Sequence, residues 1–306
     1  MIILLYSALI FSQFVNTFKQ YSMKRCGRVA PGVFNSVCIN MARSCICLVV
    51  SAAIWFFTDG TTSTPAGHLV MILAGIGSAV GLFTWLVSST FLPLIFLEGV
   101  GMVGSLVLPL LLAPVLYHND TASVPQFCGC VLLLVSLFLF ANKSDAPQKK
   151  GSLLLKTSFA FLYFLGTSAS VILKKYYTYY FTANNQGSIS YFTFIGYVAC
   201  VVFFAILFSV FYIIEKKKCT HSQSKVKLPY KNTKSYIIVA ALSLYVYDFL
   251  TSYASQLPSA IYYPLLLGLC MIFTFLLDAI VFKEKVTVKK IIGLIAVLGA
   301  IVLINF

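Results

Sequence analysis

Ten apolar stretches, separated by short polar links, dominate the 306 residues of the sequence. A bilayer core needs about 20 apolar residues for each spanning helix, and each stretch is near that length. Charged residues make up only 10% of the chain, whereas a soluble domain carries roughly 25%. The apolar runs are continuous and do not alternate with polar residues, so they predict helices and not strands. We therefore predict an all-α integral membrane protein with ten transmembrane helices over residues 1–21, 32–57, 66–88, 92–117, 124–141, 152–174, 188–214, 235–256, 258–282 and 287–306.

The two halves of the chain carry matching short motifs in the same order. The matches are Phe18-Lys19-Gln20-Tyr21 with Leu173-Lys174-Lys175-Tyr176, Leu92-Pro93 with Leu257-Pro258, and Asp120-x-x-x-Val124 with Glu284-x-x-x-Val288. The last two pairs are separated by 165 and 164 positions, which favours a repeat. We predict a first five-helix repeat over 1–141, a linker over 142–151 and a second five-helix repeat over 152–306.

Five helices per repeat have a geometric consequence. Because five is an odd number, the second repeat enters the membrane from the opposite side, and the two repeats are inverted. Inverted repeats place a substrate site near the bilayer midplane, and an exchange of their conformations gives alternating access.

The basic residues indicate an orientation in the membrane. The loops after the first, third, fifth, seventh and ninth predicted helices carry a net charge of +14, whereas the other four loops carry a net charge of zero. Cytoplasmic loops are enriched in Lys and Arg, so we predict that the first set is cytoplasmic and that both termini lie outside a cell membrane. Segment 1–21 has no basic residue before its apolar run and no small-residue cleavage site. We interpret it as a transmembrane helix and not as a signal peptide.

The closing 50 or so residues carry a known pattern. Leu257-Pro258 opens an apolar helix that contains Tyr263, Glu284 precedes a polar turn, and Ile292-Gly293 opens the last helix. Together with the five-plus-five architecture, this segment resembles the drug/metabolite transporter superfamily, in particular EamA-type transporters. It is also similar to the end of the small multidrug resistance transporters.

The resemblance implies a function and a site. It implies a midplane cavity walled by the first, third, fourth, sixth, eighth and ninth helices, and a substrate contact at Tyr263. Arg43 falls where EamA-type chains usually carry an Arg. The small multidrug resistance transporters carry a coupling Glu in their first helix, whereas 1–21 and 152–174 contain no acidic residue.

Ionisable residues inside a membrane helix must face protein or water, and so they are candidate functional residues. Glu98 and Arg43 lie at depths that a long Arg side chain can bridge, so either they form an ion pair or Glu98 binds substrate or a proton. Asp248 lies near the middle of 235–256, on one helical face with Tyr245 and Ser252. We expect it to line a cavity, and the alternative is a helix–helix hydrogen bond that serves packing. Asp248 is the preferred proton carrier, because Arg43 would hold Glu98 ionised.

Polar residues in the first and sixth helices complete the candidate site. Gln13 and Asn16 share a face of 1–21, and Thr167, Ser168 and Ser170 occupy matching positions in 152–174. Such residues either hydrogen-bond between helices or line the cavity. The predicted substrate-binding or coupling residues are Glu98, Asp248, Arg43, Tyr263, Gln13, Asn16, Ser168 and Tyr245.

The leading hypothesis is a secondary transporter of a small metabolite or drug, with proton coupling as one option. The predicted partners are a small-molecule substrate and the lipid bilayer, with the chain as a monomer or homodimer; we expect no nucleic acid, cofactor, metal or enzymatic activity. An organic-phosphate or nucleotide-sugar antiporter is the alternative within transport, and it would need several cations in the cavity, for which Arg43 and Lys19 are candidates. An intramembrane lipid-handling enzyme and a structural membrane subunit are the alternatives from other classes. A formed polar cavity would argue against the structural subunit.

Overall fold

The computed structural model describes residues 2–30, 32–58, 62–88, 94–117, 123–140, 153–222, 230–281 and 286–304. Within these ranges the chain forms ten α-helices, one short π-helix and no strand. The α-helices are α1 (Ile2–Val29), α2 (Val33–Thr58), α3 (Pro65–Ser88), α4 (Leu94–Leu116), α5 (Val124–Phe140), α6 (Leu153–Tyr177), α7 (Ile189–Ser222), α8 (Tyr230–Ala254), α9 (Ser259–Ile280) and α10 (Val288–Ile304). The predicted linker 142–151 lies outside the described residues.

Each predicted apolar stretch corresponds to one helix, so the all-helical class is confirmed. Seven helices in the described ranges, namely α1, α2, α3, α6, α7, α8 and α9, are long and apolar enough to cross a membrane. Shorter apolar helical stretches, Gly104–Leu116 and Val124–Ser136, lie in α4 and α5. The chain is therefore a multi-pass membrane protein.

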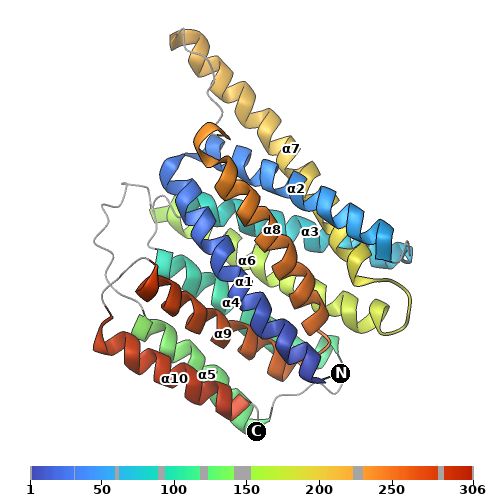
Figure 1. Cartoon of the computed structure of the whole chain (residues 1–306), viewed down its shortest axis with the longest axis vertical. Helices are drawn as coiled ribbons and strands as arrows, with labels where there is room; N and C mark the ends of the chain where they lie inside the picture. The colour runs from blue at the N-terminus through green and yellow to red at the C-terminus, as the bar shows by residue number, and fades with distance from the viewer. Residues whose placement is uncertain are drawn as a thin grey trace.

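The helices form a bundle with three regions along its long axis (Figure 1). At one end α5 lies beside α10, and at the other end α2 lies beside α7, which extends beyond the rest of the bundle. Between them, α1 packs along α8 and α3 packs along α6. The α3–α6 contact depends on glycine, because a Cβ atom on Gly166 would lie 2.6 Å from the backbone nitrogen of Gly81.

The end of α6 differs from the prediction. The predicted helix ends at residue 174, whereas α6 continues to Tyr177 and then into the π-helix Thr178–Thr182. Lys174 and Lys175 are both buried and so do not belong to a polar loop. The aromatic run that follows them is apolar enough to extend the span to Thr182.

Candidate functional site

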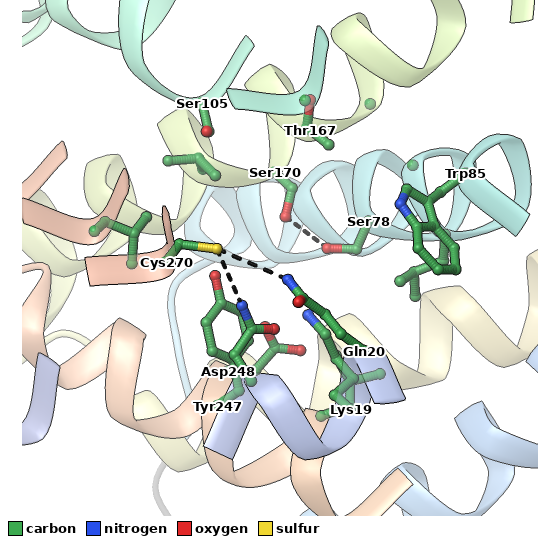
Figure 2. Close-up of a pocket in the computed structure, with 18 of the residues that line it drawn as sticks. Lys19, Gln20, Ser78, Trp85, Ser105, Thr167, Ser170, Tyr247, Asp248 and Cys270 are labelled. Carbon is green, nitrogen blue, oxygen red and sulfur yellow. Dashed lines mark hydrogen bonds between the residues drawn. The ribbon is translucent and has the colours of Figure 1, made fainter. Parts of the chain in front are cut away.

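A cavity of about 210 Å3 lies in the middle of the bundle, and polar side chains form part of its wall. Its wall comes from α1, α3, α4, α6, α8 and α9, the six helices that the resemblance implied, and α2 adds Arg43. In Figure 2, Lys19, Tyr247 and Asp248 lie on one side of the cavity, and Ser78 and Ser170 lie on the other. The polar side chains that line it are Gln13, Asn16, Lys19, Gln20, Arg43, Ser78, Ser105, Tyr163, Thr167, Ser170, Lys174, Tyr247 and Asp248.

Asp248 is held by partners from two other helices. Its Oδ1 atom accepts a hydrogen bond of 3.2 Å from Lys174 Nζ on α6, which is also an ion pair. Its Oδ2 atom accepts a 2.6 Å hydrogen bond from the hydroxyl of Tyr197 on α7. The side chain keeps 22% of its surface exposed, so the carboxylate is oriented by protein but still reaches the cavity. An ionised group that is paired and partly hydrated is the arrangement that a membrane interior tolerates.

Lys174 connects the acid to the rest of α8. Its ammonium also donates to Thr251 Oγ1 at 3.1 Å, one turn after Asp248. The same ammonium lies 5.9 Å from the ring centroid of Tyr247. Lys19 on α1 lies over that ring too, at 4.3 Å. Lys19 and Lys174, which occupy matching positions in the repeat motif, therefore both lie near the ring of Tyr247.

Arg43 is 1% exposed and enters the cavity wall from α2. Its Nη2 atom donates a 2.6 Å hydrogen bond to Asn40 Oδ1, whereas its buried Nε atom has no hydrogen-bond acceptor among the described residues. Glu98, its predicted ion-pair partner, lies in α4, but its side chain is outside the described part of the structure. The Glu98–Arg43 pair thus stays a prediction.

Amide side chains from α1 form the wall that faces α9. Asn16 Nδ2 donates to Gln13 Oε1 at 3.2 Å and lies 3.5 Å from the sulfur of Cys270. Gln20 accepts a 3.1 Å hydrogen bond from Thr274 of α9. Ser78 and Ser170 share a 2.6 Å hydrogen bond between α3 and α6. Side-chain hydrogen bonds thus join neighbouring helices on two sides of the cavity.

Four of the eight predicted site residues line the cavity: Gln13, Asn16, Arg43 and Asp248. Three others do not line it in the described structure. Ser168 donates to the backbone oxygen of Gly104 at 2.7 Å and joins α6 to α4. Tyr245 packs in the apolar cluster formed by α2, α3, α7 and α8, with its ring 6.3 Å from that of Tyr197.

Tyr263 is the third residue that the structure places away from the cavity. It is fully buried in the apolar cluster around α9, and its hydroxyl lies 3.4 Å from that of Tyr117. Ser168, Tyr245 and Tyr263 therefore pack against neighbouring helices. The substrate contact that the resemblance implied at Tyr263 has no counterpart in this cavity.

Lys174 and Lys175 are neighbours in the sequence, but one lines the cavity and the other binds backbone oxygens. Lys175 is 2% exposed and donates to the backbone oxygens of Ser255 and Leu257, just beyond the end of α8. Lys174 faces the cavity. Lys174 was not among the site residues predicted from the sequence. The match between residues 18–21 and 173–176 was the signal, since it made Lys174 the counterpart of Lys19.

Metal ligands do not gather in the part of the chain that the structure describes: no group of three His, Cys, Asp or Glu side chains could hold an ion there. The polar groups that line the cavity in the described structure are ammonium, guanidinium, carboxylate, amide and hydroxyl groups. Such groups bind and release a polar solute or a proton.

Comparisons with known proteins agree with this architecture. The model of the EamA-like transporter family matches residues 176–306, which confirms the resemblance for the second half of the chain. No curated protein sequence matches the chain. A solved structure described only as "Crystal structure of protein" is 11% identical, with a TM-score of 0.61 over 98% of each chain, and shows the fold alone. The family match indicates a membrane transporter of small molecules.

Proposed function

We propose that this chain, whose second half matches EamA-like transporters, is a secondary transporter that moves a small metabolite or drug by alternating access. The observation that carries the proposal is the cavity in the middle of the bundle, which contains polar and ionisable side chains from both halves of the chain. Polar and ionisable side chains inside a membrane protein are costly, and those that line a cavity mark substrate or ion pathways. It also disfavours a purely structural subunit.

The pattern of helix contacts supports two related halves, 1–141 and 152–306. If each helix is replaced by the helix five places away in the chain, the α3–α6 contact becomes the α8–α1 contact, and the α3–α7 contact becomes the α8–α2 contact. All four of these contacts occur in the structure. The same replacement leaves the α2–α7 contact and the α5–α10 contact unchanged. A two-fold relation between the halves accounts for this pattern. With five crossings in each half, the axis would lie in the membrane plane, as alternating access by inverted repeats requires.

Asp248 is the coupling residue in this proposal. It is an acid inside a membrane helix, it reaches the cavity, and two helices besides its own hold it in place. Intramembrane acids of this kind carry protons in pumps and transporters. Glu98 remains the second candidate for coupling.

The test begins with a thermal-shift screen of the purified protein against metabolite pools, because a compound that binds the native state raises its melting temperature. Radiolabelled binder is then offered to proteoliposomes with and without a proton gradient. We expect the wild-type protein to concentrate the binder with the gradient. The Asp248→Asn variant should exchange the binder across the membrane without concentrating it. Glu215→Gln, near the end of α7, is the control in which another acidic residue is replaced by its amide.

Two results would count against the proposal. A binder that never crosses the membrane in either direction would reject transport. Full concentrative uptake by Asp248→Asn, at wild-type abundance, would remove Asp248 from coupling and leave Glu98 as the acid to test.

A further inference from the structure

A second, smaller cavity lies against Asp248, and we call it the side cavity. Its volume is about 40 Å3, and its wall comes from α3, α6, α7 and α8. One water molecule needs about 10–15 Å3 of cavity volume and two to four polar partners, so the side cavity suits a few waters and not a metabolite. The hydroxyl, ammonium and carboxyl groups in its wall belong to Ser78, Ser170, Lys174, Thr193, Tyr197, Asp248 and Ser252.

Asp248 belongs to the wall of the side cavity and also to that of the central cavity of about 210 Å3. Lys174, which donates to its Oδ1 atom, lines both cavities as well. Tyr197, which donates to its Oδ2 atom, is among the described residues that line the side cavity but not among those that line the central one. An acid in this position can exchange a proton with one cavity and affect a solute in the other.

Helices α3 and α7 begin at one end of the bundle, and α6 and α8 end there. His68 Nε2, near the start of α3, lies 2.8 Å from the hydroxyl of Tyr191, near the start of α7. The ring centroid of Tyr177, the last residue of α6, lies 4.8 Å from that of Phe192. The contacts of Lys175 join α6 to the end of α8. The charge difference between the loops predicts that this end lies outside the cell.

The side cavity lies nearer to this end than the central cavity does. Its lining residues fall within 74–82 of α3, 170–174 of α6 and 248–252 of α8, whereas those of the central cavity fall within 78–85, 163–174 and 244–248. Phe192 in its wall is only three residues after the start of α7, which is about 5 Å along the helix axis.

From these positions we propose that the side cavity is a proton path from this end of the bundle to Asp248, separate from the route of the solute. The inference rests on the proposed function and specifies how its coupling acid is protonated. The oxygen of Tyr197 donates its proton to Oδ2 and can still accept another. A hydronium ion in the side cavity gives a proton to that oxygen while Tyr197 passes its own proton to Oδ2. Hydronium becomes water, Asp248 becomes the neutral acid, and Tyr197 remains a phenol.

Protonation of Asp248 removes the ion pair on its Oδ1 atom. Lys174 is then free to reorient, and because it also lines the central cavity, the proton changes the site that the solute occupies. This link between the two cavities is what coupling requires.

Other titratable side chains surround Asp248, so a pH profile of activity would not identify the group that takes the proton. Those described on neighbouring helices are Lys19 of α1, Arg43 and Cys47 of α2, Lys174 of α6, Tyr197 and Cys200 of α7, and Tyr262 of α9. Tyr247 lies beside it on α8. The experiment therefore follows Asp248 by its own signal.

Infrared difference spectroscopy tests the path without a solute. The purified full-length protein in nanodiscs is exposed to a rapid fall in pH, and the carboxyl C=O band that is missing in Asp248→Asn reports the protonation of Asp248. We expect this band to appear in the wild-type protein. Tyr197→Phe should slow its appearance by about tenfold or more, as expected when a positioned proton donor is removed. Tyr212→Phe, at a position that is 39% exposed, is the control.

Gly196 offers a second way to close the path. It lines the side cavity, and a Cβ atom on it would have no atom of another helix within 4 Å. Gly196→Ala and Gly196→Val should therefore fold, and they should slow protonation progressively as the side chain fills the cavity. Gly299→Ala and Gly299→Val on α10, where the nearest atom to a Cβ is 3.8 Å away, are the matched controls. The melting temperature of each variant verifies its folding.

Three outcomes would overturn the inference: no Asp248 band appears, Tyr197→Phe and both Gly196 variants protonate at the wild-type rate, or the Gly299 variants are slowed as much as the Gly196 variants. The result is separate from that of the transport assay. Protonation by this path in a protein that moves no solute would reject the proposed function alone. Gradient-driven uptake, with wild-type protonation rates in all variants, would reject the path alone.

Discussion

The hydroxyl of Tyr197 on α7 donates a 2.6 Å hydrogen bond to Asp248 Oδ2 on α8, on the side of the carboxylate opposite Lys174. The acid is therefore oriented from two helices at once, and only one of these contacts is with a cation. This arrangement allows Asp248 to give up its ion pair and remain hydrogen-bonded.

Tyr197→Phe should lower the free energy of unfolding by about 1–3 kcal/mol, because a charged acceptor loses its donor while the ring keeps its packing. The loss of stability should be smaller in the Asp248→Asn background, since the effects of substitutions in one hydrogen-bond network are not additive. The free energy of unfolding of the purified variants is measured. Tyr212→Phe is the control, because Tyr212 is 39% exposed. Additive losses in the double variant would contradict the contact.

Lys175→Met should destabilise the protein. Lys175 is 2% exposed and donates to the backbone oxygens of Ser255 and Leu257. The substitution leaves two buried acceptors unpaired, so we expect a loss of about 2–4 kcal/mol. Thermal unfolding is compared with that of Lys217→Met, whose lysine is exposed. Equal stability of the two variants would show that Lys175 is not a structural residue.

Gly166→Ala should separate α3 from α6. A Cβ atom on Gly166 would lie 2.6 Å from the Gly81 nitrogen and 2.9 Å from the Gly77 oxygen, both of which are backbone atoms. Overpacking of this kind costs about 1–3 kcal/mol. In Gly299→Ala the nearest atom, Leu132 Cδ2, is 3.8 Å away, so this control should be neutral or slightly stabilised. A melting temperature of Gly166→Ala at or above the wild-type value would argue against the close contact.

The orientation in the membrane can be tested by cysteine labelling. The charge difference between the loops predicts that 215–234 is cytoplasmic. In a cysteine-free background, an impermeant maleimide should label Ala183→Cys, at an exposed position after the π-helix, in intact cells. Ser224→Cys should be labelled only after permeabilisation. The opposite pattern would reverse the orientation.

The sequence alone predicted the helices and part of the site. Each span is a local property, since its length and apolar content decide whether it can cross a bilayer. The same reasoning identified Asp248 and Arg43, because an ionisable residue inside such a span needs an explanation wherever it lies. Gln13 and Asn16 followed from their shared helical face, and the structure places all four in the cavity wall.

The tertiary structure alone decided which polar residues meet. Lys174 and Lys175 are adjacent in sequence and chemically alike, yet consecutive residues of a helix point about 100° apart. One therefore reaches Asp248, whereas the other binds backbone oxygens near the end of α8. The same geometry turned Ser168 toward α4 while Thr167 and Ser170 line the cavity. The amino-acid sequence determines which residues are polar inside the membrane, but the rotation and packing of each helix determine what those residues face.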